Sequence, residues 1–411
     1  MSTSLPSASI VENVRFNRTV IVPNALQGLF KKRPGPIKIA TAMDVDGEGI
    51  RLLSSLRDKH GGKPVWVRVV TDPALLLLSV DDVREALEGS PDPFAPDPEA
   101  KKVGMSHFQP DALTISRGEV WADRRRWAEA VLGAAPRSRL EAVMGEEIGA
   151  MAEFDFDALH HAFQRFTRRM VFGDGAADDA RLSELLETLM DQANGRPSQQ
   201  SKEFAAFETL VGEYVEGAED GSLAGAAADV PVSAETRPER QFTHWLFATG
   251  DTLALNVWRA LALLATYPDE EDLSGTLQEA MRLWPTTPML SRVTLKKVLW
   301  HGVEVPAGTQ ILIVNTFLHR DAERLGDAAD RFTPSGWAKG GAFVDDWGLN
   351  FFSHGPQVCP GASLAVHLGV VAMRAVLDKQ GKPVFDGSPK LEPGADMPAM
   401  LDPFALKLAL S

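Results

Sequence analysis

Beyond residue 118 the chain places apolar residues at the spacing expected of helices. They recur every three or four positions, which is the period of one helical face. The pattern predicts helices over five segments: 118–132, 137–152, 156–173, 178–194 and 201–219. Further along, the pattern predicts a helix from about Leu273 to Trp284, ended by Pro285, and a last helix from about Gly361 to Asp378.

One stretch, from Leu246 to Tyr267, is apolar on nearly every side. Its length matches a membrane span, but Asp251, Asn256 and Arg259 interrupt it and would be costly in lipid. We therefore expect a long helix buried inside the protein, whose few polar residues need partners or a function.

Two shorter regions predict strands. Residues 64–80 read as an alternating strand, a turn and an apolar run, which is typical of a hairpin, and residues 293–315 read as short strands joined by turns. We expect Asp81 to cap a short helix that ends near Glu88. The fold class that follows is mainly α with a small β part.

The connections are of three kinds. A long proline-rich connection covers residues 89–117, and a connection of that length is usually functional or disordered. A shorter one covers residues 191–202, and residues 221–229 form a link of low complexity. We expect one domain over residues 1–411, with a flexible segment over about residues 1–20.

Composition and charge exclude several classes of protein. The 411 residues include 42 Lys and Arg against 56 Asp and Glu, for a formal net charge of −14, and a single cysteine. One thiol cannot form an internal disulfide or a Cys₂ or Cys₄ metal site. The acidic balance argues against binding of nucleic acid. No signal-peptide pattern is present at the N-terminus, so a cytoplasmic protein with no membrane attachment is expected.

The single cysteine, Cys359, stands in the segment Phe352-Ser-His-Gly-Pro-Gln-Val-Cys-Pro-Gly361, just before the last predicted helix. We expect Cys359 at the N-cap of that helix, where free amides and the positive end of the helix dipole would stabilise a thiolate. Pro360 suits a first helical turn, and Gly355 allows a tight turn in the backbone. The alternative is a buried structural cysteine, which is the commoner fate of a lone thiol.

This F-x-x-G-x-x-x-C-x-G segment resembles the haem-binding loop of the cytochrome P450 superfamily. Upstream, Glu279-Ala-Met-Arg282 resembles the E-x-x-R helix of that family, whose two side chains share one helix face. The two motifs stand in the family's order, with short predicted strands between them. The resemblance implies that Cys359 is the ligand of the haem iron, that Glu279 and Arg282 form a structural pair, and that Phe352, Gly355 and Gly361 contact the cofactor.

On the long buried helix, Ala248-Thr-Gly-Asp-Thr252 resembles the acid and alcohol motif of the same family. Reductive activation of dioxygen needs two protons in a pocket that excludes water, and a carboxylate beside a hydroxyl can deliver them. The resemblance assigns this role to Asp251 and Thr252. We expect the Thr252 hydroxyl to bond back to the carbonyl of Ala248 and open the helix locally. The alternative is that Asp251 pairs with a nearby arginine and Thr252 is a core residue.

Haem carries two propionates, whose burial requires cations or hydrogen-bond donors. The resemblance assigns Trp121, Arg125 and Arg292 to them. Arg124 and Arg126 flank the first site and are expected on the surface, where they would receive an acidic ferredoxin.

Besides Thr249, which stands where the family usually has glycine, the chain departs from the family at three positions. Gln357 stands where a His or Arg usually binds a propionate. Gly336 stands where an arginine often completes the E-x-x-R network, so that either another group such as Arg331 serves instead or the network is incomplete. Pro360 has no N–H to donate to the sulfur.

The resemblance further implies a triangular helical prism with haem b (iron protoporphyrin IX) between the long central helix and the C-terminal helix. It implies a cytoplasmic monooxygenase, of a kind typical of secondary metabolism, that inserts one oxygen atom from O₂ into an apolar small molecule. Electrons would come from NAD(P)H through a ferredoxin and a ferredoxin reductase. The pocket is expected to involve five residues and the 191–202 connection, although each could equally belong to a surface loop or the core: His107, Phe108, Pro288, Met289 and Leu290.

Two other functions are compatible with the motifs. A haem peroxygenase would use hydrogen peroxide directly, and Cys-Pro-Gly resembles that branch of the family, but its members carry Arg-Pro where this chain has Asp251-Thr252. A non-catalytic haem sensor would need no proton delivery. The chemical identity of the substrate does not follow from the sequence.

Overall fold

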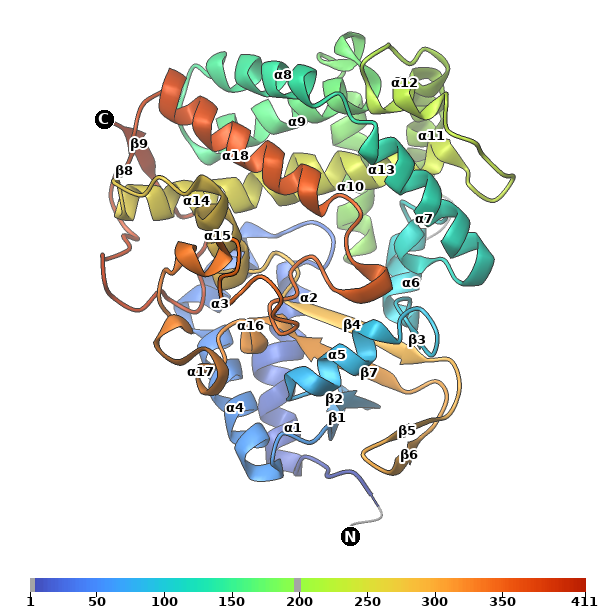
Figure 1. The fold of residues 1–411 in the computed structure, drawn as a ribbon, viewed down its shortest axis with the longest axis vertical. Helices are drawn as coiled ribbons and strands as arrows, with labels where there is room; N and C mark the ends of the chain where they lie inside the picture. The colour runs from blue at the N-terminus through green and yellow to red at the C-terminus, as the bar shows by residue number, and fades with distance from the viewer. Residues whose placement is uncertain (1–3, 196–200) are drawn as a thin grey trace. The chain divides into compact units, whose positions relative to one another are not determined.

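The computed structural model describes residues 4–195 and 201–411 of the chain (Figure 1). Contacts divide the chain into two compact units. Unit 1 consists of Met1–Glu99, Met281–Cys359 and Gly394–Asp402, and unit 2 consists of Ala100–Ala280, Pro360–Pro393 and Pro403–Ser411.

Unit 1 combines helices with most of the strands. Its helices and short helical segments are α1 (Ile10–Phe16), η1 (Asn17–Ile21), α2 (Val22–Gln27), α3 (Pro34–Ala42), α4 (Val45–His60), α5 (Val80–Glu88), α16 (Asn315–Leu318), α17 (Ala322–Leu325), η5 (Gly326–Ala328), η6 (Pro334–Trp337) and η7 (Gly355–Gln357). Its strands are β1 (Val65–Val69), β2 (Asp72–Leu76), β3 (Phe94–Ala95), β4 (Met289–Thr294), β5 (Val298–Trp300), β6 (Val303–Val305) and β7 (Gln310–Val314).

Five of these strands form one sheet in the order β1-β2-β7-β4-β3, and β5 pairs with β6 in a separate hairpin. The predicted hairpin is confirmed, since β1 pairs with β2 in antiparallel register from Val65 opposite Leu76 to Val69 opposite Asp72. The apolar run from Ala74 to Leu78 is completely buried because β2 lies inside the sheet, paired with β7 on its other side.

Unit 2 is almost entirely helical (Figure 1). Its helices and short helical segments are α6 (Glu99–Ser106), η2 (Leu113–Ile115), α7 (Gly118–Gly133), α8 (Arg137–Gly149), α9 (Phe156–Phe172), η3 (Asp174–Ala176), α10 (Arg181–Ala193), α11 (Lys202–Glu216), α12 (Leu223–Ala227), α13 (Pro238–Phe247), η4 (Ala248–Leu253), α14 (Ala254–Thr266), α15 (Leu273–Leu283) and α18 (Ala362–Lys379). Strands β8 (Pro383–Phe385) and β9 (Leu408–Leu410) form a small hairpin. Helix α6 begins with the last residue of unit 1, and α15 ends in unit 1.

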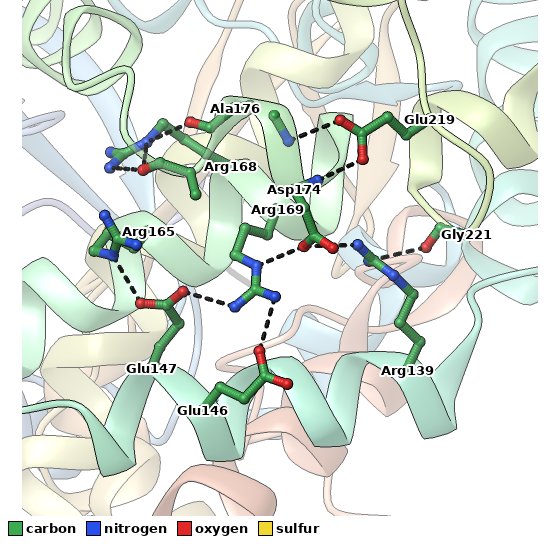
Figure 2. A network of polar contacts seen from close by, with 12 residues as sticks. Arg139, Glu146, Glu147, Arg165, Arg168, Arg169, Asp174, Ala176, Glu219 and Gly221 are labelled. Carbon is green, nitrogen blue, oxygen red and sulfur yellow. Dashed lines mark hydrogen bonds and ion pairs between the residues drawn. The ribbon is translucent and has the colours of Figure 1, made fainter.

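A network of ion pairs fixes α9 against α8 (Figure 2). Glu147, which is 6% exposed, accepts from Nε of Arg165 and from Nη1 of Arg169, each at 2.8 Å. Arg169 also donates to Glu146 at 2.8 Å and to Asp174 at 2.6 Å. Burial works against the charge of Arg169, but the three carboxylates outweigh it and raise its pKa. Since a partly buried network of several charges is worth more than isolated surface pairs, α9 is a fixed element of unit 2.

Three expectations about local structure need correction. Ser79, and not Asp81, caps α5, because its hydroxyl oxygen accepts from the N–H of Asp82. The connection over residues 89–117 contains α6 and η2, and the link over residues 221–229 contains α12, whose Leu223 is completely buried. Short helices of this kind are stabilised by tertiary burial and leave little periodicity in the sequence. The first twenty residues include α1 and most of η1.

The mainly helical fold class with a small β part is confirmed. None of the described helices is both long enough and apolar enough to cross a membrane.

Candidate functional site

The candidate residues are distributed over both units, and each part is described within its own unit. The first part is the cysteine loop of unit 1, which is closed on itself. The N–H of Cys359 donates to the carbonyl of Phe352 at 2.8 Å, and η7 forms the turn between them. Cys359 forms no disulfide and is half-buried.

Gly355 is required where the loop meets α5. It has a φ of +66°, and a Cβ atom there would lie 2.5 Å from the carbonyl oxygen of Leu87. Only glycine allows both the left-handed conformation and this close approach. The loop therefore holds a defined shape ahead of the thiol.

The N-cap prediction for Cys359 is wrong. Helix α18 begins at Ala362, and Gly361 is its N-cap residue, so the thiol lies two residues before the cap. The bond from the N–H of Cys359 to Phe352 ties the cysteine to the preceding turn and keeps it out of the helix. The sulfur still lies close to the N-terminal end of α18 in sequence.

Arg292 on β4 is a buried cation without an anion. It is 3% exposed and donates to the hydroxyls of Ser90 and Ser353, at 2.7 and 3.2 Å, and to the carbonyl of Ser291 at 2.9 Å. Burial lowers its pKa to about 10. No carboxylate of the described residues pairs with it. A buried guanidinium with only neutral partners suits an anionic group of a ligand.

Two further candidates for propionate binding, Gln357 and Trp121, have buried N–H donors that no described residue accepts from. The side-chain nitrogen Nε2 of Gln357 and the indole nitrogen Nε1 of Trp121 are both buried and have no hydrogen-bond partner among the described residues. Leaving such donors unpaired costs about 1–3 kcal/mol each, which is unusual in a native structure unless a ligand supplies the acceptor. Both residues thus fit contact with an oxygen-bearing group such as a propionate.

Helix α7 carries Trp121 together with three consecutive arginines. Arg125 is mostly buried and donates from Nε to Glu129 at 2.7 Å. The prediction that Arg124 lies on the surface is wrong: it is 4% exposed and donates to Asp111, to the hydroxyl of Ser116 and to a backbone carbonyl. Arg126, in contrast, has a side chain that is 70% exposed, as expected.

The acid and alcohol motif lies on η4, a π-helical segment between α13 and α14. The helix is opened here, but the Thr252 hydroxyl forms no hydrogen bond to Ala248 or to any other described residue. The backbone carbonyl of Thr252 accepts from the Asn256 side chain at 3.0 Å. Asp251 pairs with His160 of α9, at 2.7 Å between Oδ1 and Nε2, and not with an arginine.

Arg282 of the E-x-x-R motif is held by backbone oxygens of unit 1. It is completely buried and donates to the carbonyls of His319, Ala329 and Arg331 at 3.0, 2.9 and 2.7 Å. Glu279, one turn earlier on α15, is also completely buried. The guanidinium of Arg331 does not complete the network, because it pairs with Asp396 and its side chain is 44% exposed.

The surroundings of Gly336 show why no arginine side chain at this position joins the E-x-x-R network. The ring of Phe343 occupies the space beside this glycine, since a Cβ atom on residue 336 would come within 2.4 Å of it. The guanidinium of Arg282 lies 5.4 Å from the centre of the same ring, within the range of a cation–π contact. Phe343 therefore takes the place that a side chain at residue 336 would fill.

The residues expected to line the substrate pocket lie in different parts of the fold. Phe108 is 1% exposed and lines a cavity with residues of α11 and α13, whereas His107 is buried and bonds to Gln192 of α10 at 2.8 Å. Met289 and Leu290 belong to β4 and pair with β7, and the carbonyl of Pro288 accepts from a backbone N–H. In the 191–202 connection, residues 196–200 lie outside the described residues.

Sequence reasoning missed His160, Gln164 and Glu187, which surround Asp251. His160 lies 91 residues before Asp251, so no local motif could have joined them. The only available signal was the presence of a histidine and a glutamine one turn apart on a predicted amphipathic helix.

Comparisons with known proteins agree with these features. A sequence model of the family Cytochrome P450 matches residues 273–379, which include the E-x-x-R helix and the cysteine loop. Cytochrome P450 714C3 of Oryza sativa subsp. japonica is 28% identical over 228 residues, or 47% of this chain and 43% of the rice protein. Indoleacetaldoxime dehydratase of Arabidopsis thaliana is 29% identical over 133 residues, or 32% of this chain and 26% of that protein. The chain thus aligns with less than half the length of these relatives.

Solved structures show the same fold at low sequence identity. The retinoic acid-bound cyanobacterial CYP120A1 matches with a TM-score of 0.69 at 15% identity, over 86% of this chain and 93% of that one. A zebrafish cytochrome P450 with abiraterone matches with a TM-score of 0.69 at 15% identity, over 88% and 99%. The chain therefore has the cytochrome P450 fold, and its residues 273–379, which include the cysteine loop and the buried Arg282, match the cytochrome P450 family.

Proposed function

We propose that this protein is a haem-thiolate monooxygenase that inserts one atom of O₂ into an apolar small molecule. The observation that carries the proposal is the cysteine loop. The only thiol of the chain stands at the end of a loop closed by the bond from Cys359 to Phe352 and seated against α5 through Gly355. A thiolate at this position is the ligand that the family's iron requires.

The residues present suit one haem b. Cys359 would hold the iron, and Arg292, Gln357, Trp121 and Arg125 would hold the propionates. Three of these four offer a buried cation without an anion or a buried donor without an acceptor. When bound, the haem supplies the iron chemistry that activates oxygen, and the protein supplies binding, orientation and protons.

Asp251 and Thr252 have the roles of proton donor and hydroxyl on the catalytic helix. The Thr252 hydroxyl is not engaged by any described residue, so it is available to a water molecule or to oxygen. The π-helical turn that carries both residues is a form of helix frequent at functional sites.

Electrons are proposed to come from NAD(P)H through a ferredoxin and its reductase. Arg126 is an exposed cation on α7 that could contact an acidic partner. The cytoplasmic location, the absence of membrane attachment and a place in secondary metabolism remain predictions.

Turnover under two regimes tests the function. With a surrogate ferredoxin, its reductase and NADH, we expect substrate-dependent NADH consumption and an oxygenated product, because Asp251 and Thr252 suit reductive oxygen activation. Product formation with hydrogen peroxide alone, and none with the ferredoxin system, would favour the peroxygenase. Haem binding without turnover in either regime would favour a sensor.

Replacing Pro360 by alanine should raise the reduction potential of the haem by about 20–60 mV. The change adds one N–H donor next to the sulfur, and a net hydrogen bond of ~0.5–1.5 kcal/mol corresponds to about that shift for one electron. Redox titration of the purified variants measures it. Pro356→Ala, in the same loop but three residues before the cysteine, is the control. An unchanged potential in Pro360→Ala would refute the argument.

A further inference from the structure

The carboxylate of Asp251 has a specific partner outside its own helix. Oδ1 of Asp251 lies 2.7 Å from Nε2 of His160, on the helix α9 that packs against η4. The ring of His160 is stacked on Phe156, one turn earlier, with 5.6 Å between ring centres and 6° between planes. The imidazole is therefore held by Asp251 on one side and by the ring of Phe156 on the other. Helix α9, which carries it, is itself fixed by the ion pairs of Figure 2.

A second carboxylate completes the cluster. Glu187 of α10 accepts from the Gln164 side chain at 2.6 Å, and Gln164 lies one turn after His160 on α9. One ligand atom each from His160, Glu187 and Asp251 lies within 4.8 Å of the others. The hydrogen bonds to His160 and Gln164 already satisfy one oxygen of each carboxylate, so the cluster needs no ion to hold it together.

The cluster lies between solvent and η4. The His160 side chain is 25% exposed, and its second nitrogen, Nδ1, bonds to no described residue. Beside the cluster, a small cavity is lined by Glu187, Asp251 and Thr167, whose buried hydroxyl has no partner among the described residues. A cavity with an unsatisfied hydroxyl beside two carboxylates offers an ordered water the polar partners it needs.

We propose that His160 is a positioning and proton-relay residue that passes protons from solvent to Asp251, with the carboxylate of Glu187 beside the imidazole. The inference rests on the proposed monooxygenase function and adds to it the route by which protons reach the acid of the catalytic helix.

The charges around His160 favour the imidazolium form. Burial lowers the pKa of His160, but the hydrogen bond to Asp251 and the charges of Asp251, Glu187 and Asp157 outweigh burial and raise it. Arg168, which borders the same cavity, is the nearby opposing charge and donates to Ser183 and to backbone carbonyls. Because the pKa is raised, the pairing stabilises the fold fully below the unfolded value of about 6.5 and is lost as pH rises through the folded value.

The step moves one proton and no electrons. The imidazolium releases the proton of Nε2 to Oδ1 of Asp251, which leaves a neutral ring with its remaining proton on Nδ1. Nε2 then regains a proton from hydronium or a buffer acid in solvent. Imidazole suits this task because its charge changes near neutral pH and it has two ring nitrogens.

Three variants test the relay. His160→Gln keeps a donor toward Asp251 but cannot carry a proton, and Glu187→Gln removes the charge that favours imidazolium. His161→Gln is the matched control, because His161 is the next residue on α9 and is exposed. In ferredoxin-driven turnover we expect His160→Gln to lower kcat about 100-fold with little change in KM, which is the low end of the range for acid–base groups. Turnover with hydrogen peroxide, which brings its own protons, should be unchanged.

A second readout does not need turnover. NMR titration of the histidine signals in the full chain, assigned by their loss in His160→Gln, should give His160 a pKa above its ordinary value, and Glu187→Gln should lower it. If wild-type turnover is normal but His160→Gln behaves like His161→Gln, or if the pKa of His160 is not raised, the relay is refuted and the proposed monooxygenase function still stands. If the wild type shows no turnover in any regime, the proposed function fails and the relay with it.

Discussion

Cys359→Ser should abolish the thiolate-type spectrum of the reduced, carbon monoxide-bound haem. The chain contains one cysteine, so no second thiol can replace the ligand. A serine hydroxyl remains protonated near neutral pH and is a weak ligand, whereas a cysteine thiol ionises far more readily and binds metals as the thiolate. The fold should persist, because the change is small and Cys359 is only half-buried. The carbon monoxide difference spectrum measures the effect, and circular dichroism checks the fold.

Cys359→His separates loss of the ligand from loss of the pocket. Histidine binds haem iron through nitrogen, so this variant should retain haem but give a nitrogen-type spectrum. If Cys359→Ser keeps the thiolate-type spectrum of the wild type, the sulfur is not the ligand and the proposed function fails.

Arg282→Lys should destabilise the protein by about 3–5 kcal/mol, which is the cost of breaking a buried charged network. Arg282 is completely buried, and its guanidinium donates to three backbone carbonyls and faces the ring of Phe343. A lysine ammonium is a compact charge on one nitrogen, so it cannot reach the three separate carbonyl oxygens that the planar guanidinium of Arg282 contacts. Native proteins are stable by only about 5–15 kcal/mol, so a large loss of folded protein is expected.

The matched control for Arg282 is Arg331→Ala. Only the backbone carbonyl of Arg331 serves the network, and its half-exposed side chain pairs with Asp396 at the surface. Such pairs contribute about 0–1 kcal/mol. Denaturant unfolding of both variants measures the difference. Equal losses of stability would show that the side chain of Arg331, and not Arg282 alone, supports this part of unit 1.

Many of the helices and strands could be predicted from the spacing of apolar residues close together in the sequence. The hairpin β1–β2 and the helices α7 to α11 have a strong period in their apolar positions, and the structure confirms them. Helix α6 escaped prediction because it is short and stands among prolines. The cap of α5 was misassigned because Ser79 and Asp81 are both good capping residues, and only the backbone geometry distinguishes them.

In the candidate site, too, residues close together in the sequence could be identified and their distant partners could not. Phe352, Gly355 and Cys359 could be identified together because they belong to one loop, and Arg282 could be identified by its spacing from Glu279. The partners of these residues could not. Phe343 beside Gly336, Asp111 beside Arg124 and His160 beside Asp251 are brought together by packing of separate elements.

The sequence by itself determined that this protein is mainly helical, has one thiol in the loop before its last helix and carries the motifs of the P450 family in order. These features depend on residues close together in the chain, whose spacing directly reflects the local backbone. Only the tertiary structure decided that Gly361 and not Cys359 caps α18, that Phe343 fills the space beside Gly336, and that Asp251 pairs with a histidine. Those outcomes depend on which distant side chains share a buried space, and burial makes an unpaired polar group so costly that its partner is set by packing.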